Sequence, residues 1–141
     1  MKRLIVAAAA LFSLAATADP AKVTVLEGDD PARGIVASSL REDVAGGDPS
    51  VAAARAWLAK AAKAYGEDQK AVAAHCERTA RWFVDMTRTR ATPLEMLEAL
   101  ALLVKPGLTM QDAMRGYVEA RRATTGKTHA EALAKLGLPG R

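Results

Sequence analysis

The sequence predicts an all-α protein, a small Ala-rich bundle of five or six helices with an extended N-terminal arm. Apolar residues recur at intervals of three and four along most of the chain after residue 30, which is the spacing of one helix face. Helix-start signals, in which Asp or Thr precedes Pro or stands three residues before an acid, occur five times in the same region. Alanine, the strongest helix former, makes up about a fifth of the residues after position 18.

The first 18 residues have the three-part layout of a cleaved secretory signal peptide. Lys2 and Arg3 form a basic start, residues 4–14 form an apolar run, and small residues at 16–18 form a cleavage site. The apolar run is too short to span a bilayer, which takes roughly 20 residues. We therefore predict a periplasmic or secreted protein with no stable membrane span after cleavage. An uncleaved N-terminal anchor is the alternative.

Cleavage would leave residues 19–141, which is enough chain for one domain. The net charge falls from +4 to +2, because Lys2 and Arg3 are removed with the signal. Nucleic-acid binding therefore loses its main support from composition. Residues 22–27 alternate like a strand that has no partner, so we predict residues 19–30 as an extended arm and residues 31–141 as the helical domain.

The first two helices are each expected to begin at an Asp-Pro pair. Asp30 would cap a helix that carries Val44 and runs to the glycines at 46–47. Asp48 would cap a second helix that ends at Gly66.

A third helix is expected over residues 67–90. Its apolar stripe consists of Val72, Cys76, Thr79, Phe83 and Met86, with Trp82 beside it. The stripe places Cys76 against the core, where burial leaves the thiol inert. An intermolecular disulfide is the alternative in an exported protein, whereas no basic neighbour favours a catalytic thiolate.

The last three helices share a Thr at the start. The start signals are Thr92–Glu95, Thr109–Asp112 and Thr128–Glu131. They predict helices over residues 93–104, 110–123 and 129–136. The helix over 93–104 is apolar on nearly every face and too short to cross a bilayer, so we expect it at the centre of the bundle.

The sequence contains no constellation that predicts catalysis, a cofactor or a metal site. His75, Cys76 and Glu77 are consecutive, but neighbouring helical residues point about 100° apart and cannot easily hold one ion. His129 lies in the first turn of a helix, where a structural role is expected. Glu95 is explained by capping. The remaining acids of the third helix fit the ion pairs Glu77–Arg81 and Asp85–Arg88.

Three arginines surround an aromatic residue on the third helix. We predict Arg78, Arg81, Trp82 and Arg88 as the partner-binding surface, because arginine beside an aromatic ring suits anions and acidic partners. A solvated helix face is the alternative, since Glu77 and Asp85 are interleaved with the arginines. A second exposed basic face is expected from Arg115, Arg121 and Arg122.

These observations predict a small exported helical protein that acts by binding another macromolecule, either a protein or an anionic component of the cell envelope. An adaptor, a chaperone-like factor, and an inhibitor or immunity protein all fit this description. The alternatives are an envelope-acting hydrolase that uses a carboxylate pair and a structural subunit of an envelope assembly. Either a monomer or an oligomer is compatible with the sequence.

Overall fold

The computed structural model describes residues 30–140, which form six helices and contain no strand. The helices are α2 (Pro31–Leu40), α3 (Pro49–Tyr65), α4 (Gln69–Thr87), α5 (Pro93–Leu102), α6 (Met110–Arg122) and α7 (His129–Lys135). The all-α prediction is therefore confirmed. The predicted signal peptide, and the predicted arm except for its last residue, lie outside the described residues. None of the described helices is both long and apolar enough to cross a membrane.

Each of the six helices begins at an Asp or Thr whose side chain accepts a backbone N–H of the first turn. Thr92 and Thr128 form complete capping boxes, as predicted. Thr109 makes only half of one, because it accepts from the N–H of Asp112 at 3.1 Å without a reciprocal bond. The Asp112 carboxylate instead lies 3.3 Å from Arg115, one turn further along the helix.

Helix α2 is shorter than predicted, since it ends at Leu40 rather than at the glycines at 46–47. Arg41 adopts the left-handed conformation and its N–H bonds to the carbonyl of Ala37, which ends the helix. Val44 is buried from the following loop rather than from the helix. Its carbonyl accepts from Nε of Arg33 at 2.6 Å, which holds the loop against α2.

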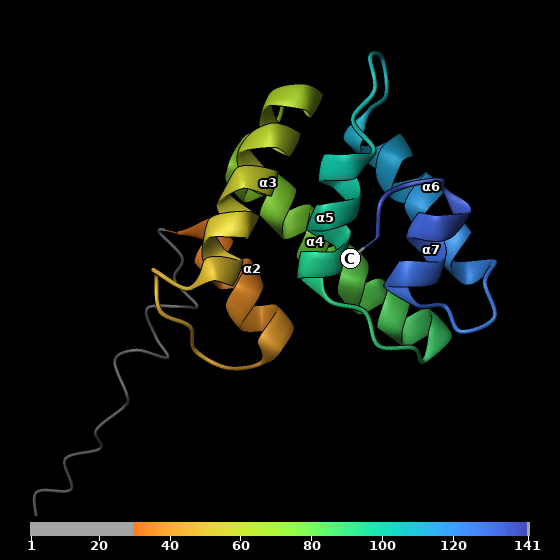
Figure 1. The fold of residues 1–141 in the computed structure, drawn as a ribbon, viewed down its shortest axis with the longest axis horizontal. Coiled ribbons are helices and arrows are strands. Elements are labelled where there is room, and N and C mark those ends of the chain that lie inside the picture. The colour runs from red at the N-terminus through yellow and green to blue at the C-terminus, as the bar shows by residue number, and fades with distance from the viewer. Residues whose placement is uncertain (1–29, 141) are drawn as a thin grey trace, which may run out of the picture.

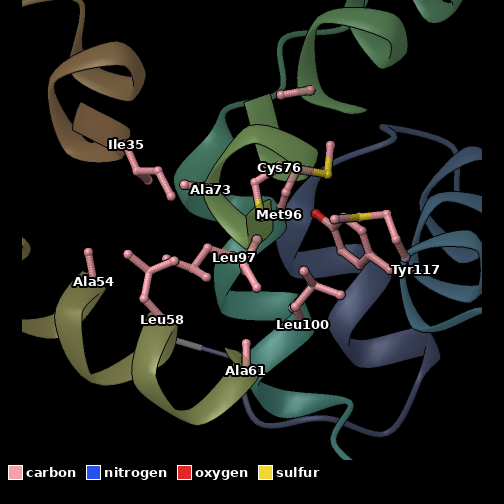
Figure 2. Packing of buried hydrophobic residues seen from close by; sticks show 14 of the residues in the cluster. Ile35, Ala54, Leu58, Ala61, Ala73, Cys76, Met96, Leu97, Leu100 and Tyr117 are labelled. Carbon is pink, nitrogen blue, oxygen red and sulfur yellow. The ribbon is translucent and has the colours of Figure 1, made fainter. Parts of the chain in front are cut away.

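Helix α5 lies at the centre of the bundle, as predicted, although it ends at Leu102 and not at 104. Helices α2, α3 and α4 pack on it, and α6 packs on it from the other side (Figure 1). Met96, Leu97 and Leu100 are fully buried where side chains of α3, α4 and α6 meet (Figure 2). The Tyr65 hydroxyl also donates to the Leu100 carbonyl at 2.8 Å, so α3 and α5 are joined by a hydrogen bond.

A buried serine joins the end of α2 to the beginning of α5. The Ser39 hydroxyl donates to the Ile35 carbonyl at 2.7 Å and accepts from the Leu94 N–H at 2.9 Å. The Leu94 N–H is one of the donors that a helix start leaves without an intrahelical partner. The buried Ser39 side chain therefore holds the two helix ends together and gives the Leu94 N–H a hydrogen-bond partner.

Helix α4 buries three of the five residues of the predicted stripe, while Thr79 is half-buried. Val72, Cys76 and Phe83 are fully buried, but Met86 is 62% exposed. The inward position of the last turn belongs to Thr87, four residues after Phe83, whose hydroxyl donates to the Phe83 carbonyl at 2.7 Å. Burial raises the pKa of the Cys76 thiol to about 12, so the folded protein holds it protonated and inside the core.

Candidate functional site

A groove of about 770 Å³ lies between three segments of the described chain. Its walls are the end of α2 (residues 38–41), the outer side of α4, and residues 88–93, which lead to α5. Ala80 and Ser39 are buried in its floor, and Leu40 stands 47% exposed at its edge. The groove is therefore open to solvent, and its lining mixes serine and charged side chains with Ala80, Val84 and Leu40.

Four exposed arginines line this groove: Arg41, Arg81, Arg88 and Arg90. Two of the predicted partner-binding residues, Arg81 and Arg88, are brought together there. Arg78 and Trp82 do not line the groove. Their positions are rotated around the axis of α4 away from Arg81 and the groove.

Arg41 is a groove residue that the sequence pattern does not indicate. It reaches the groove from α2, forty residues before Arg81, and only the packing of α2 against α4 brings the two together. No local periodicity carries that information.

The predicted ion pairs Glu77–Arg81 and Asp85–Arg88 do not form, so that prediction is wrong. Among residues 30–140, none of the four groove arginines has a carboxylate within ion-pair distance. Exposed pairs on a helix contribute only a few tenths of a kcal/mol, and water competes for both charges. The guanidinium donors of the groove are thus free of ion pairs to the rest of the described fold.

Two of these arginines occupy backbone conformations that favour glycine. Arg41 has φ 59° and Arg88 has φ 56°, and each ends a helix in the left-handed conformation. That conformation costs roughly 1–2 kcal/mol for an L residue, and glycine is the common choice at such helix ends. Strained residues of this kind cluster at functional sites. Both of the strained arginines line the same groove.

Arg88→Gly is expected to stabilise the fold. The substitution relieves the left-handed backbone but adds freedom to the unfolded chain, so the free energy of unfolding should rise by about 0.5–1 kcal/mol. Urea denaturation followed by circular dichroism measures it. Arg78→Gly, in the interior of the same helix, is the matched control and should destabilise by about 1 kcal/mol. A loss of stability in Arg88→Gly would contradict the strain assignment.

Three large apolar side chains are exposed in the described chain, one at the groove and two further around α4. The three in the described chain are Leu40, Trp82 at 44% exposure and Met86 at 62%. Leu40 lines the groove, and the other two follow Arg78 at four-residue intervals on α4. We call the outward surface of α4 formed by Glu77, Arg78, Arg81, Trp82, Asp85, Met86 and Arg88 the α4 face. Exposed apolar side chains that lie next to each other, as Trp82 and Met86 do one turn apart on α4, mark interaction sites.

Arg121 is buried, which corrects the prediction that it lies on an exposed basic face. It is 1% exposed, and its guanidinium donates to Glu95, to the Tyr117 hydroxyl and to the carbonyls of Arg90 and Lys127 at 2.7–2.9 Å. It also lies 4.9 Å from the centre of the Phe83 ring. The helical period does indicate this burial, because Arg121 follows the inward-facing Tyr117 by four residues and so lies on the same face of α6.

The same cluster continues to His129, which has a structural partner on each side of its ring. The Tyr117 hydroxyl lies 2.7 Å from Nδ1, and Glu98 lies 3.1 Å from Nε2. A carboxylate, an imidazole and a hydroxyl in series resemble a nucleophilic triad in order. However, Tyr117 is fully buried, and burial is the main cause that raises its pKa to about 12. The cluster joins α6 and α7 to α5, and its hydroxyl is closed to a substrate.

His75 belongs neither to the groove nor to the cluster around Arg121 and His129. Its Nε2 atom is buried without a hydrogen-bond partner, and burial, followed by the charge of Arg78, lowers its pKa. The contribution of neutral His75 to the free energy of unfolding should therefore be fully present above pH 6.5. It should fall as the pH drops below 6.5, because the unfolded chain then binds a proton more readily than the folded one. His75→Gln should remove part of this slope in urea titrations at pH 5 and 7. An identical slope would contradict the assignment.

Residues 30–140 contain no group of three or more His, Cys, Asp or Glu side chains that could hold a metal ion. The predicted residues Arg81 and Arg88 belong to the groove, whereas the polar cluster around Arg121 and His129 is internal to the fold.

Comparisons with protein families, with curated proteins and with solved structures find no match to this chain.

Proposed function

We propose that this protein is exported and binds another macromolecule of the cell envelope through the groove and the adjoining α4 face. Four arginines without a carboxylate partner in the described chain, drawn from three segments around one groove, are the observation that carries the proposal. An adaptor, a chaperone-like factor or an inhibitor would each use such a surface. Export is supported by the basic start, apolar run and small-residue site of residues 1–18.

The chemistry of the groove favours a partner that presents acidic groups. Every cation that lines it is an arginine, and the planar guanidinium can hold a carboxylate or phosphate through two parallel hydrogen bonds. Trp82 is half exposed on the adjoining stripe and supplies an aromatic anchor, the residue type that dominates many binding interfaces. Leu40 and Val84 provide apolar contact within the groove.

The carboxylates of the groove support hydrolysis less well than binding. Glu77 and Asp85 are eight residues apart on α4, which is about 12 Å along the helix axis. Glycosidase carboxylates lie roughly 5–9.5 Å apart. This axial separation favours binding over the close carboxylate pair that the hydrolase alternative needs.

Reversing two groove charges tests the proposal. We expect the double variant Arg81→Glu/Arg88→Glu to lose crosslinked capture of its envelope partner while its helical circular dichroism is unchanged, because both side chains are exposed. The matched control, Lys60→Glu/Arg115→Glu, makes the same change of net charge on α3 and α6 and should retain capture. Equal capture by the double variant and the wild type would overturn the assignment of this surface.

A further inference from the structure

We infer that the α4 face binds a second copy of this chain across a two-fold axis, with the two α4 helices antiparallel. The inference deepens the proposed function and rests on its claim that this face is an interaction surface. It is carried by the order of charges along α4. Glu77, Arg81, Asp85 and Arg88 alternate in sign and follow one another at about one helical turn.

This order is complementary to itself only when one helix is reversed. In the antiparallel arrangement Glu77 faces Arg88 of the second copy, and Arg81 faces its Asp85. The symmetry repeats both contacts, so four opposite-charge pairs form around one axis. In a parallel two-fold arrangement each of these residues would instead meet its own copy, which places like charges together. None of the four is ion-paired within residues 30–140.

The exposed tryptophan of the α4 face fits the same arrangement. The axis passes close to the level of Phe83, so Trp82 and its copy lie beside it, on the same side of the helix pair. Trp82 is exposed in the single chain and would be covered there, whereas Met86 lies further around α4, toward α6. Arg41 and Arg90 lie on the groove side of α4 and, in both copies, stay on the opposite side of the pair. A dimer would therefore leave Arg41 and Arg90 of each copy for an envelope partner, while Arg81 and Arg88 contact the second copy.

A charge swap tests the pairing. We expect the purified protein to sediment as a dimer at low salt. Arg81→Glu alone should weaken self-association at least about tenfold, because each dimer then holds two like-charge contacts with Asp85. Asp85→Arg alone should act in the same way. The double variant Arg81→Glu/Asp85→Arg restores opposite charges across the axis and should recover the dimer. Lys60→Glu, on α3, is the control and should remain dimeric.

The outcomes separate this inference from the proposed function. A wild-type protein that sediments as a monomer at every concentration overturns the dimer, and partner capture that still depends on Arg81 and Arg88 would then leave the proposed function standing. A dimer that neither single reversal weakens, or that the double variant does not restore, also overturns the inference. Circular dichroism of each variant shows whether α4 is intact, so that a lost dimer is not mistaken for a lost fold.

Discussion

Arg121→Met is expected to lower the free energy of unfolding by about 3 kcal/mol, because removing one side of a buried charged network leaves its partners unsatisfied. The methionine would fill much of the same volume but donate no hydrogen bond. The carbonyls of Arg90 and Lys127 would each lose a donor inside the fold. Glu95 would keep its capping bond to the Thr92 N–H but lose its cation.

The loss should be localised as well as large. Arg121 connects α6 to the beginning of α5 and to the segment before α7, so amides of α6 and α7 should exchange with solvent before those of α3. Urea denaturation gives the stability, and hydrogen exchange gives the location. The neighbouring, exposed Arg122→Met is the control and should change stability by no more than about 0.5 kcal/mol. A fully stable Arg121→Met protein would contradict a stabilising role for the network.

Leu100→Asp is expected to abolish cooperative folding. Leu100 is fully buried in the central helix, and the substitution removes its apolar contacts and places a carboxylate among them. Truncating a buried leucine alone costs roughly 3–5 kcal/mol, and an unpaired buried charge adds to that loss. Most domains of this size have only 5–15 kcal/mol of stability. Thermal unfolding followed by circular dichroism should show no cooperative transition.

Two further variants test whether the effect depends on the burial of position 100 and on the charge introduced there. Leu40→Asp makes the same change at a leucine that is 47% exposed, and it should move the melting temperature by only a few degrees. Leu100→Met keeps the volume and polarity of the core and should cost less than about 1.5 kcal/mol. A Leu100→Asp protein that melts within a few degrees of the wild type would contradict the central position of α5.

The local features of the fold were predictable because they depend on neighbours in sequence. Thr92 and Thr128 begin helices as predicted, since a capping side chain and its N–H lie three residues apart. The end of α2 was predicted wrongly, because Val44 keeps the helical spacing while the chain has already turned at Arg41. A buried residue at the expected interval does not show which backbone conformation carries it there.

The candidate site was predictable only in part, for the same reason. Arg81 lies on α4 and Arg88 is its C-cap, seven residues later, so their common face follows from the helical period. Arg41 joins them through tertiary packing, which no local pattern records. Arg121 shows the opposite error, because its charge suggested the surface although its position after Tyr117 pointed inward. There the hydrogen-bond partners outweighed the preference of arginine for water.

The hydrogen bonds of Ser39 have a consequence for how the groove would receive a partner. Because this hydroxyl ties the end of α2 to the beginning of α5, two of the groove walls keep their spacing before anything is bound. A receptor that is already shaped loses little conformational entropy on association, so more of the contact energy appears as affinity. The backbone around the groove would keep its conformation on binding. Most conformational change would occur in the arginine side chains and in the incoming molecule.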